Sequence, residues 1–315
     1  MSKIHEALRK AQEEKSQAAS CETRPKAEEH PKPAVQEQAQ AAFALPGNVP
    51  SQGGHHRSFS GQYLRFEDLL KQCAEPIWQL DPNAIVFSGS YGPANGAEQF
   101  RTLRTRIYHF RETHPLKKVL VTSAIAAEGK TFVATNLAQA FACERNRRVL
   151  LIDGDLRSPR LHLPLGAPIS PGLAEYLRDE ASEAEIIQHG REGNLCFIAG
   201  GKGGRENPSE LLSNGRLQKL LDRITPLFDW VVIDSTPCLP VADASVLSTL
   251  CDGLLLVVKA KSTPLAAVQR AGHELRKRNI IGVVLNAVDE SDSYGAYYAY
   301  PYSGSDPKAK NENTQ

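Results

Sequence analysis

Short apolar runs alternate with segments of helical character through most of the chain, and this alternation constrains the fold more than any other feature. We expect helices at residues 131–144, 209–224, 242–250 and 264–277, between strands at residues 118–122, 148–153, 195–199, 230–234, 253–260 and 281–287. Nearly continuous apolar strands separated by helices are typical of a parallel sheet that is buried on both faces. The sequence therefore predicts an α/β domain with a doubly wound, mainly parallel sheet and helices on both faces. Ligands of such sheets bind at the carboxyl ends of the strands.

The composition divides the 315 residues into four parts. Residues 1–15 have the character of a short charged helix, which Ser2 can cap. Residues 16–60 are rich in Ala, Gln, Glu and Pro and lack the large apolar side chains that offset the entropy cost of ordering, so we expect a disordered linker. Residues 61–290 form the expected globular domain, and residues 291–315 a flexible polar tail.

Charge and hydropathy exclude several classes of function. The 37 basic and 36 acidic residues give a net charge of +1, which offers no global attraction for nucleic acid, and we expect no nucleic-acid partner. No apolar stretch approaches the roughly 20 residues that a membrane-spanning helix needs. The six cysteines are scattered and form no CxxC pair. These features are typical of a cytoplasmic protein in a reducing compartment.

A phosphate-binding loop follows the first strand. Residues 123–131 read SAIAAEGKT and lead into a helix, so that Gly129, Lys130 and Thr131 stand at a strand–loop–helix junction. This is the arrangement of a P-loop, in which backbone N–H groups and the helix N-terminus attract phosphates. Lys130 can reach the β- and γ-phosphates of ATP, and the Thr131 hydroxyl can ligate Mg²⁺. Ala124 replaces the usual first glycine, and an ordinary strand–helix turn that happens to read GKT is the alternative interpretation.

Acidic residues end two further strands. Asp153 and Asp155 follow the apolar run LLI, and Asp234 follows VVI. Because the carboxyl ends of parallel strands meet at one edge of a sheet, we expect these acids beside the P-loop. A carboxylate after an apolar strand commonly holds Mg²⁺ or its water shell in P-loop enzymes. Thr131, Asp153, Asp155 and Asp234 are therefore the candidate metal ligands, although each acid alone would also fit a surface turn.

With these motifs in place, the chain resembles the bacterial tyrosine kinases (BY-kinases) of capsule and exopolysaccharide synthesis over about residues 82–302. The loop SAIAAEGKT is similar to the Walker A motif of that family, with Ala126 and Ala127 in place of Pro and Gly. LLIDGDLRSP is similar to its Walker A′ motif, and VVIDSTP to its Walker B motif. EQFRTLR, at residues 98–104, is similar to the ExxRxxR motif that mediates ring assembly in the family.

The resemblance implies a P-loop NTPase fold and a protein-tyrosine autokinase that uses ATP and Mg²⁺. It implies catalytic roles for Lys130, Asp153 and Asp155, the last as a metal contact or as the acceptor of the tyrosine proton. The residues expected to bind the nucleotide are Ala127, Glu128, Gly129, Lys130, Thr131, Phe132 and Asn286. The expected phosphate acceptors are the five tyrosines clustered in the tail, Tyr294, Tyr297, Tyr298, Tyr300 and Tyr302.

The resemblance also implies partners. Glu98, Arg101 and Arg104 lie on one helical face and would join copies of the chain into a ring, although an intrahelical Glu98–Arg101 pair is the alternative interpretation. A membrane-embedded polysaccharide chain-length regulator would activate the kinase in trans, and a phosphotyrosine phosphatase would reverse the reaction. The kinase would then be recruited from the cytoplasm to the inner face of the cell membrane, where it regulates polysaccharide polymerisation and export.

Two other functions share these motifs. A ParA/MinD-type ATPase, which positions cargo or DNA, has the same fold but carries a signature lysine early in the P-loop, where this chain has Ile125. A regulator that binds nucleotide without turnover would be compatible with the alanines of the loop, because a Gly→Ala change is harmless only where φ is negative. The tyrosine-rich tail, taken by itself, would also fit a disordered adhesive segment.

Overall fold

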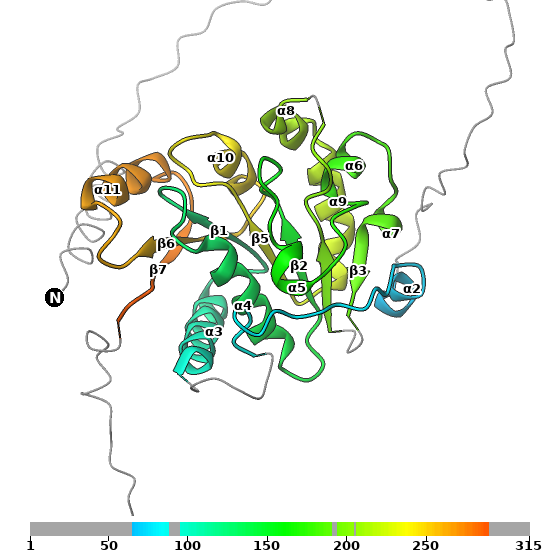
Figure 1. The fold of residues 1–315 in the computed structure, drawn as a ribbon, viewed down its shortest axis with the longest axis horizontal. Coiled ribbons are helices and arrows are strands. Elements are labelled where there is room, and N and C mark those ends of the chain that lie inside the picture. Colours follow the sequence, from blue (N-terminus) through cyan, green and yellow to red (C-terminus); the bar gives the residue numbers. More distant parts are fainter. Residues whose placement is uncertain (1–64, 88–94, 191–193, 205, 290–315) are drawn as a thin grey trace, which may run out of the picture.

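The structure of the protein is a computed structural model (Figure 1). This structure describes residues 65–87, 95–190, 194–204 and 206–289, which include the P-loop and both acidic strand ends. The N-terminal helix and linker expected over residues 1–60, and the tyrosine-rich tail expected from residue 291, lie outside the described residues.

A seven-stranded sheet forms the centre of the molecule, with the strand order β3-β4-β2-β5-β1-β6-β7. The strands are β1 (Lys118–Ser123), β2 (Val149–Asp153), β3 (Ile187–His189), β4 (Leu195–Ile198), β5 (Trp230–Asp234), β6 (Gly253–Lys259) and β7 (Ile280–Asn286). All neighbouring pairs are parallel except β3 and β4. The doubly wound, mainly parallel sheet predicted from the sequence is therefore confirmed.

Helices cover both faces of this sheet (Figure 1). The helices are α2 (Phe66–Leu70), α3 (Asn95–Thr113), α4 (Lys130–Ala142), α5 (His162–Leu165), α6 (Leu173–Leu177), α7 (Glu183–Ile186), α8 (Pro208–Ser213), α9 (Arg216–Ile224), α10 (Asp243–Ser248) and α11 (Leu265–Glu274). A short 3₁₀ turn, Thr225–Leu227, follows α9.

Alternating residues of each strand pack into two separate hydrophobic cores, one on each face of the sheet. Both faces of the sheet therefore carry apolar side chains, which explains why the strands are continuous apolar runs in the sequence. In β1, Leu120 packs toward α2 and α6 to α11, whereas Val119 and Val121 pack toward α3, α4 and α5. In β2, Leu150 and Ile152 belong to the first core. With a hydrophobic layer on each face, no position within the central strands can be polar until the strand ends, and the polar residues therefore gather at the strand ends.

Besides the short helices α2, α5, α6 and α7, which the sequence did not indicate, two elements differ from the sequence-based prediction. The single helix expected over residues 209–224 is two helices, because Gly215 adopts a left-handed φ of 79° that ends one helix and begins the next. Strand β3 was not predicted: it has only three residues and pairs antiparallel at the edge of the sheet. The segment that leads from α2 reinforces this edge, where Ala74 bridges to Gln188.

Candidate active site

The P-loop joins the end of β1 to the start of α4, as the sequence predicts. Gly129 caps α4 with a φ of 91°, and a β-carbon added there would lie 2.0 Å from Nδ2 of Asn286. Both the backbone conformation and the close approach of Asn286 therefore require glycine at this position. Ala127 also has a positive φ, 64°, and is thus held in a conformation that is strained for alanine.

Two of the expected nucleotide contacts, Glu128 and Asn286, hold the backbone of the P-loop. The Glu128 side chain is buried, accepts the N–H of Ile125 at 2.7 Å and accepts the hydroxyl of Thr263. Asn286 donates its side-chain amide to the carbonyl oxygen of Glu128 at 2.9 Å. Since Thr263 follows β6 and Asn286 ends β7, the P-loop is held to the carboxyl ends of these two strands.

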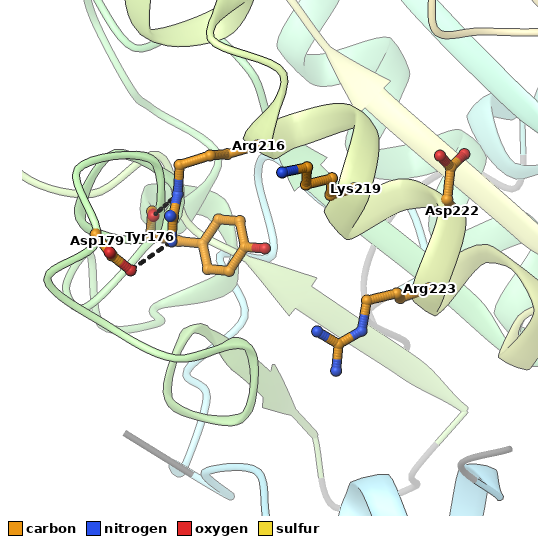
Figure 2. A pocket seen from close by; sticks show the side chains of 6 residues that line it. All are labelled: Tyr176, Asp179, Arg216, Lys219, Asp222 and Arg223. Atoms are coloured by element: carbon orange, nitrogen blue, oxygen red, sulfur yellow. Dashed lines mark hydrogen bonds and ion pairs between the residues drawn. The ribbon is translucent and has the colours of Figure 1, made fainter. Parts of the chain in front are cut away.

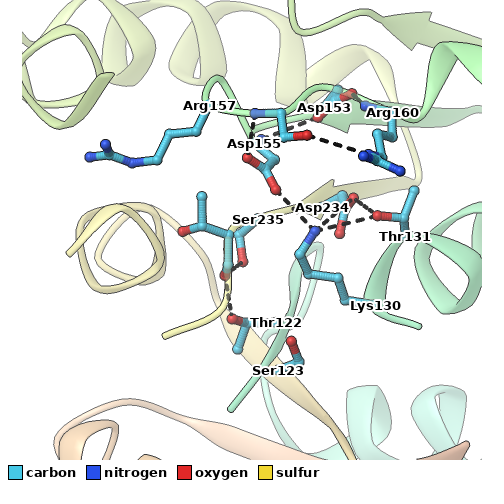
Figure 3. A network of polar contacts seen from close by, with 12 residues as sticks. Thr122, Ser123, Lys130, Thr131, Asp153, Asp155, Arg157, Arg160, Asp234 and Ser235 are labelled. Carbon is cyan, nitrogen blue, oxygen red and sulfur yellow. Dashed lines mark hydrogen bonds and ion pairs between the residues drawn. The ribbon is translucent and has the colours of Figure 1, made fainter. Parts of the chain in front are cut away.

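Lys130 lies between two carboxylates at the carboxyl edge of the sheet (Figure 3). Its Nζ is 3.0 Å from Oδ2 of Asp155 and 3.9 Å from Oδ2 of Asp234. Burial alone would lower the pKa of Lys130, but the Asp234 and Asp155 carboxylates outweigh it and raise that pKa above its ordinary value. The lysine is therefore a permanent positive charge at the point where a P-loop receives phosphates.

Asp234 and Thr131 offer oxygen atoms suited to a metal ion. The Thr131 hydroxyl donates to Oδ2 of Asp234 at 2.6 Å, while the buried Oδ1 of Asp234 has no hydrogen-bond partner among the described residues. Burial raises the pKa of Asp234 to about 6, against the opposing effect of Lys130. An orphaned buried carboxylate oxygen beside a hydroxyl fits Mg²⁺, which prefers oxygen ligands.

No group of three His, Cys, Asp or Glu side chains within the described ranges is arranged to hold a metal by protein ligands alone. In nucleotide-binding enzymes, Mg²⁺ is usually held by one or two protein oxygens together with phosphates and water.

Asp153 uses both of its oxygens on backbone N–H groups. Oδ1 accepts from Asp155 at 3.2 Å, and Oδ2 accepts from Arg160 and Leu161 at 2.9 and 3.0 Å. Burial and the neighbouring Asp234 carboxylate raise the pKa of Asp153 to about 8, although the N–H of Leu161 lowers it in part. Asp153 therefore organises the loop that follows β2, and this loop presents Asp155 to Lys130.

Some of the remaining predicted site residues make contacts within the domain, and the others lie outside the described residues. The Phe132 ring packs edge-to-face against Phe100 of α3, with centroids 5.8 Å apart. Glu98 and Arg101 form the intrahelical pair on α3 that was the alternative interpretation, and their expected role in ring assembly stays a prediction. Arg104 instead binds the carbonyl oxygen of Ala140 in α4 and the carboxylate of Glu144, which lies just after that helix. The five tail tyrosines, Tyr294, Tyr297, Tyr298, Tyr300 and Tyr302, lie outside the described residues.

Two residues that take part in the site were not found from the sequence. Thr263 holds Glu128 from a loop that is 135 positions further along the chain, and no local pattern marks it. Asp243, the first residue of α10, is fully buried and pairs with Arg157. An acidic residue at the start of a helix is a common capping signal, so its position alone did not suggest this contact.

Comparison with known proteins decides between the functions that share these motifs. The sequence model of the CobQ/CobB/MinD/ParA nucleotide binding domain matches residues 119–300. The tyrosine-protein kinase YwqD of Bacillus subtilis is 34% identical over 205 residues, which are 64% of this chain and 86% of YwqD. The tyrosine-protein kinase CpsD of Streptococcus agalactiae is 31% identical over 207 residues, 64% of this chain and 89% of CpsD. The chain belongs to the bacterial tyrosine-protein kinase family.

Solved structures agree with this assignment. The kinase domain of the Escherichia coli tyrosine kinase ETK superposes with a TM-score of 0.59 at 28% identity, covering 72% of this chain and 94% of that domain. The chimerical protein CapA2B2 superposes with a TM-score of 0.61 at 27% identity, covering 71% and 99%. The chain is thus a tyrosine-protein kinase with a nucleotide-binding P-loop domain. None of the helices within the described ranges combines the length and the hydropathy of a membrane span.

Proposed function

We propose that this kinase transfers the γ-phosphoryl group of ATP to tyrosines of its own C-terminal segment, Tyr294, Tyr297, Tyr298, Tyr300 and Tyr302. The contact between Asn286 and the P-loop carries the proposal. Because Asn286 ends β7 and touches the Glu128 carbonyl, the chain passes the edge of the nucleotide site eight positions before Tyr294. An extended chain spans about 3.5 Å per residue, so the segment can reach its own site or, as the family resemblance favours, that of a neighbouring subunit.

Charge neutralisation and positioning account for most of the catalysis of phosphoryl transfer. Lys130 supplies a fixed positive charge within a cluster of carboxylates. Thr131 and Asp234 would hold Mg²⁺, directly or through water. When bound, this ion neutralises the negative charge of the phosphates.

In the transfer, a tyrosine Oη forms a bond to the γ-phosphorus while the bond from that phosphorus to the β–γ bridging oxygen breaks, and ADP leaves with that oxygen. The tyrosine proton needs an acceptor, and we assign this role to Asp155. Asp155 is the most exposed of the three carboxylates, at 6% against 0% for Asp153 and 1% for Asp234, although its oxygens accept from the Ser158 N–H and from Lys130. We therefore expect an incoming hydroxyl to reach Asp155 first.

The cellular role follows from the family resemblance. The kinase would regulate capsule or exopolysaccharide polymerisation and export, activated in trans by a membrane-embedded chain-length regulator that recruits it to the inner face of the membrane. A phosphotyrosine phosphatase would reset the tail, and the kinase would assemble into a homo-oligomeric ring. The near balance of charge supports the expectation that nucleic acid is not a partner.

Incubation of the purified full chain with ATP and Mg²⁺, followed by mass spectrometry of tryptic peptides, tests the proposal. We expect phosphotyrosine within residues 294–302 and none in a variant with Lys130→Met. The matched control replaces the five tail tyrosines by Phe, which removes the acceptor hydroxyls and leaves the nucleotide site intact. Phosphotyrosine confined to other positions, or equal labelling of the five-Phe variant, would overturn the assignment of the tail as substrate.

A further inference from the structure

Arg157 turns away from the catalytic cluster although it lies two positions after Asp155. Figure 3 shows its side chain pointing away from Lys130 and Asp234. The guanidinium binds Asp243 in two places, Nε to Oδ2 at 2.7 Å and Nη2 to Oδ1 at 3.1 Å. The Asp243 side chain is fully buried, whereas the Arg157 side chain is 37% exposed. A two-point contact of this kind fixes direction as well as distance.

The buried Asp243 carboxylate joins three parts of the molecule. It begins α10, the helix that follows β5 and Asp234 in the chain. Its Oδ1 also accepts the hydroxyl of Ser209 in α8, and Arg157 Nη2 lies 3.1 Å from the same hydroxyl oxygen. The loop after β2, the first turn of α8 and the first turn of α10 therefore meet at one carboxylate.

The loop that carries Asp155 depends on anchors at its two ends. At its start, the Gly154 N–H donates to the carbonyl oxygen of Asp234 at 2.9 Å, and Asp153 holds the backbone N–H of Asp155. Beyond Asp155, Asp153 accepts the N–H groups of Arg160 and Leu161, and these contacts hold the loop to β2. The pair between Arg157 and Asp243 ties the same loop to α10 and, through Ser209, to α8. Without that pair, Asp155 would keep its contact with Lys130, but its loop would lose the tie to these two helices.

We propose that Asp243 is a positioning residue for phosphoryl transfer, holding Asp155 in place through Arg157. Ser209 extends the same contact to α8, so that displacement of α8 is transmitted to Asp155. The inference rests on the proposed role of Asp155. Since a misplacement of about 1 Å can cost about 100-fold in rate, a residue without contact to substrate can affect turnover strongly.

The variant Asp243→Asn tests this, because it keeps the shape and removes the charge that holds Arg157. We expect the kcat for tail phosphorylation to fall about 10- to 100-fold, as for other residues that orient a catalytic group. The KM for ATP should stay within about threefold, because Lys130 and Thr131 remain on the P-loop. If Asp243→Asn does not fold, Arg157→Lys replaces it, since lysine keeps the charge but cannot make the two-point contact.

Asp179→Asn is the matched control. Asp179 also pairs with an arginine, Arg216, through one contact at 2.6 Å, but it is exposed and lies in a surface pocket that none of the predicted site residues line (Figure 2). Asp179 has a φ of 66°, which asparagine tolerates. We expect its kcat and KM to match those of the wild type.

The double variant Arg157→Lys with Asp243→Asn should be no slower than the slower single variant, because both changes break one contact. If the decreases in kcat of the two single variants multiply in the double variant, the inference is wrong. It is also wrong if Asp243→Asn loses thermal stability while its kcat is unchanged. Asp155→Ala, measured in parallel, separates the two proposals. If Asp155→Ala is fully active, the proposed role of Asp155 is wrong; if it is inactive while Asp243→Asn is normal, only the positioning role fails.

Discussion

The side-chain amide of Asn286 donates a hydrogen bond to the carbonyl oxygen of Glu128 across 2.9 Å, and so joins the last strand to the P-loop. We expect Asn286→Ala to lower the free energy of unfolding by about 1 kcal/mol and to raise the KM for ATP about fivefold, because the loop loses its support. Asn279→Ala is the control: Asn279 makes the same type of bond to the Asp252 carbonyl at 2.7 Å, at the other end of β7. It should lose comparable stability with an unchanged KM. Equal KM changes in both variants would contradict a specific role for Asn286.

Ala127 is strained in the P-loop, with a φ of 64°. Ala127→Gly should relieve this strain and raise the free energy of unfolding by about 1 kcal/mol, or about 3 °C in Tm. Ala126→Gly is the control, because Ala126 is not among the described residues with positive φ and should only gain unfolded-state entropy. Thermal unfolding of the wild type and the two variants, without nucleotide, shows whether each change raises or lowers the Tm. A lower Tm for Ala127→Gly than for the wild type would show that the loop is not strained at this position.

Stability should depend on pH through the buried carboxyls of the site. Burial raises the pKa of Asp153 to about 8 and that of Asp234 to about 6, whereas both have pKa values near 3.9 in the unfolded chain. The folded state binds these protons more tightly, so the stability that they contribute is full below about pH 4 and is lost as the pH rises through about 8. We expect the Tm without nucleotide to fall between pH 5 and about pH 8.5.

Asp153→Asn should flatten that decline, because asparagine does not titrate. Asp222→Asn, at an exposed carboxyl on α9, should leave it unchanged. If the slope is the same in Asp153→Asn as in the wild type, another group causes it.

The part of the site that could be predicted from the sequence is the part that local patterns encode. Strands buried on both faces must be apolar until they end, so Asp153 and Asp234 mark the edge where ligands bind. The GKT sequence marks the start of α4 in the same way. The pairing of Asp243 with Arg157 spans 86 positions, and only the order of the strands in space brings the two together. Neither residue type nor spacing could have indicated it.

The N-terminal limit of the folded domain is predicted to lie between residues 60 and 66. Phe66 is buried and packs edge-to-face on Phe228 with centroids 5.5 Å apart, and Leu69 is buried beside it. Deletion of residues 1–60 should therefore leave the Tm nearly unchanged, whereas deletion of residues 1–75 should lower it strongly. Phe66→Ala in the full chain should cost about 3 kcal/mol, which urea unfolding would measure. Loss of the folded domain on deletion of residues 1–60 would show that the N-terminal segment is structural.

The residues of α3 that are predicted to join subunits differ in their contacts: Arg104 packs within the domain, whereas Glu98 and Arg101 are exposed. This difference decides which variant should be used to test assembly. Arg104 donates to the Ala140 carbonyl at 2.7 Å and pairs with Glu144, so its removal would damage the packing of α3 on α4. The Glu98 and Arg101 side chains remain 64% and 48% exposed. The informative variant is therefore the double change Glu98→Ala with Arg101→Ala.

We expect the unphosphorylated kinase to self-associate through this face and phosphorylation to shift it toward the monomer. Each phosphotyrosine adds about −1.5 to −2 charges at neutral pH, so five would add about −8 to −10 per tail and make neighbouring tails repel one another. Light scattering before and after addition of ATP and Mg²⁺ measures the change. The variant with the five tail tyrosines changed to Phe should keep its mass, and Glu98→Ala with Arg101→Ala should be monomeric throughout. If phosphorylation leaves the mass of the wild type unchanged, charge on the tail does not control assembly, and if the double variant still associates, the interface lies elsewhere.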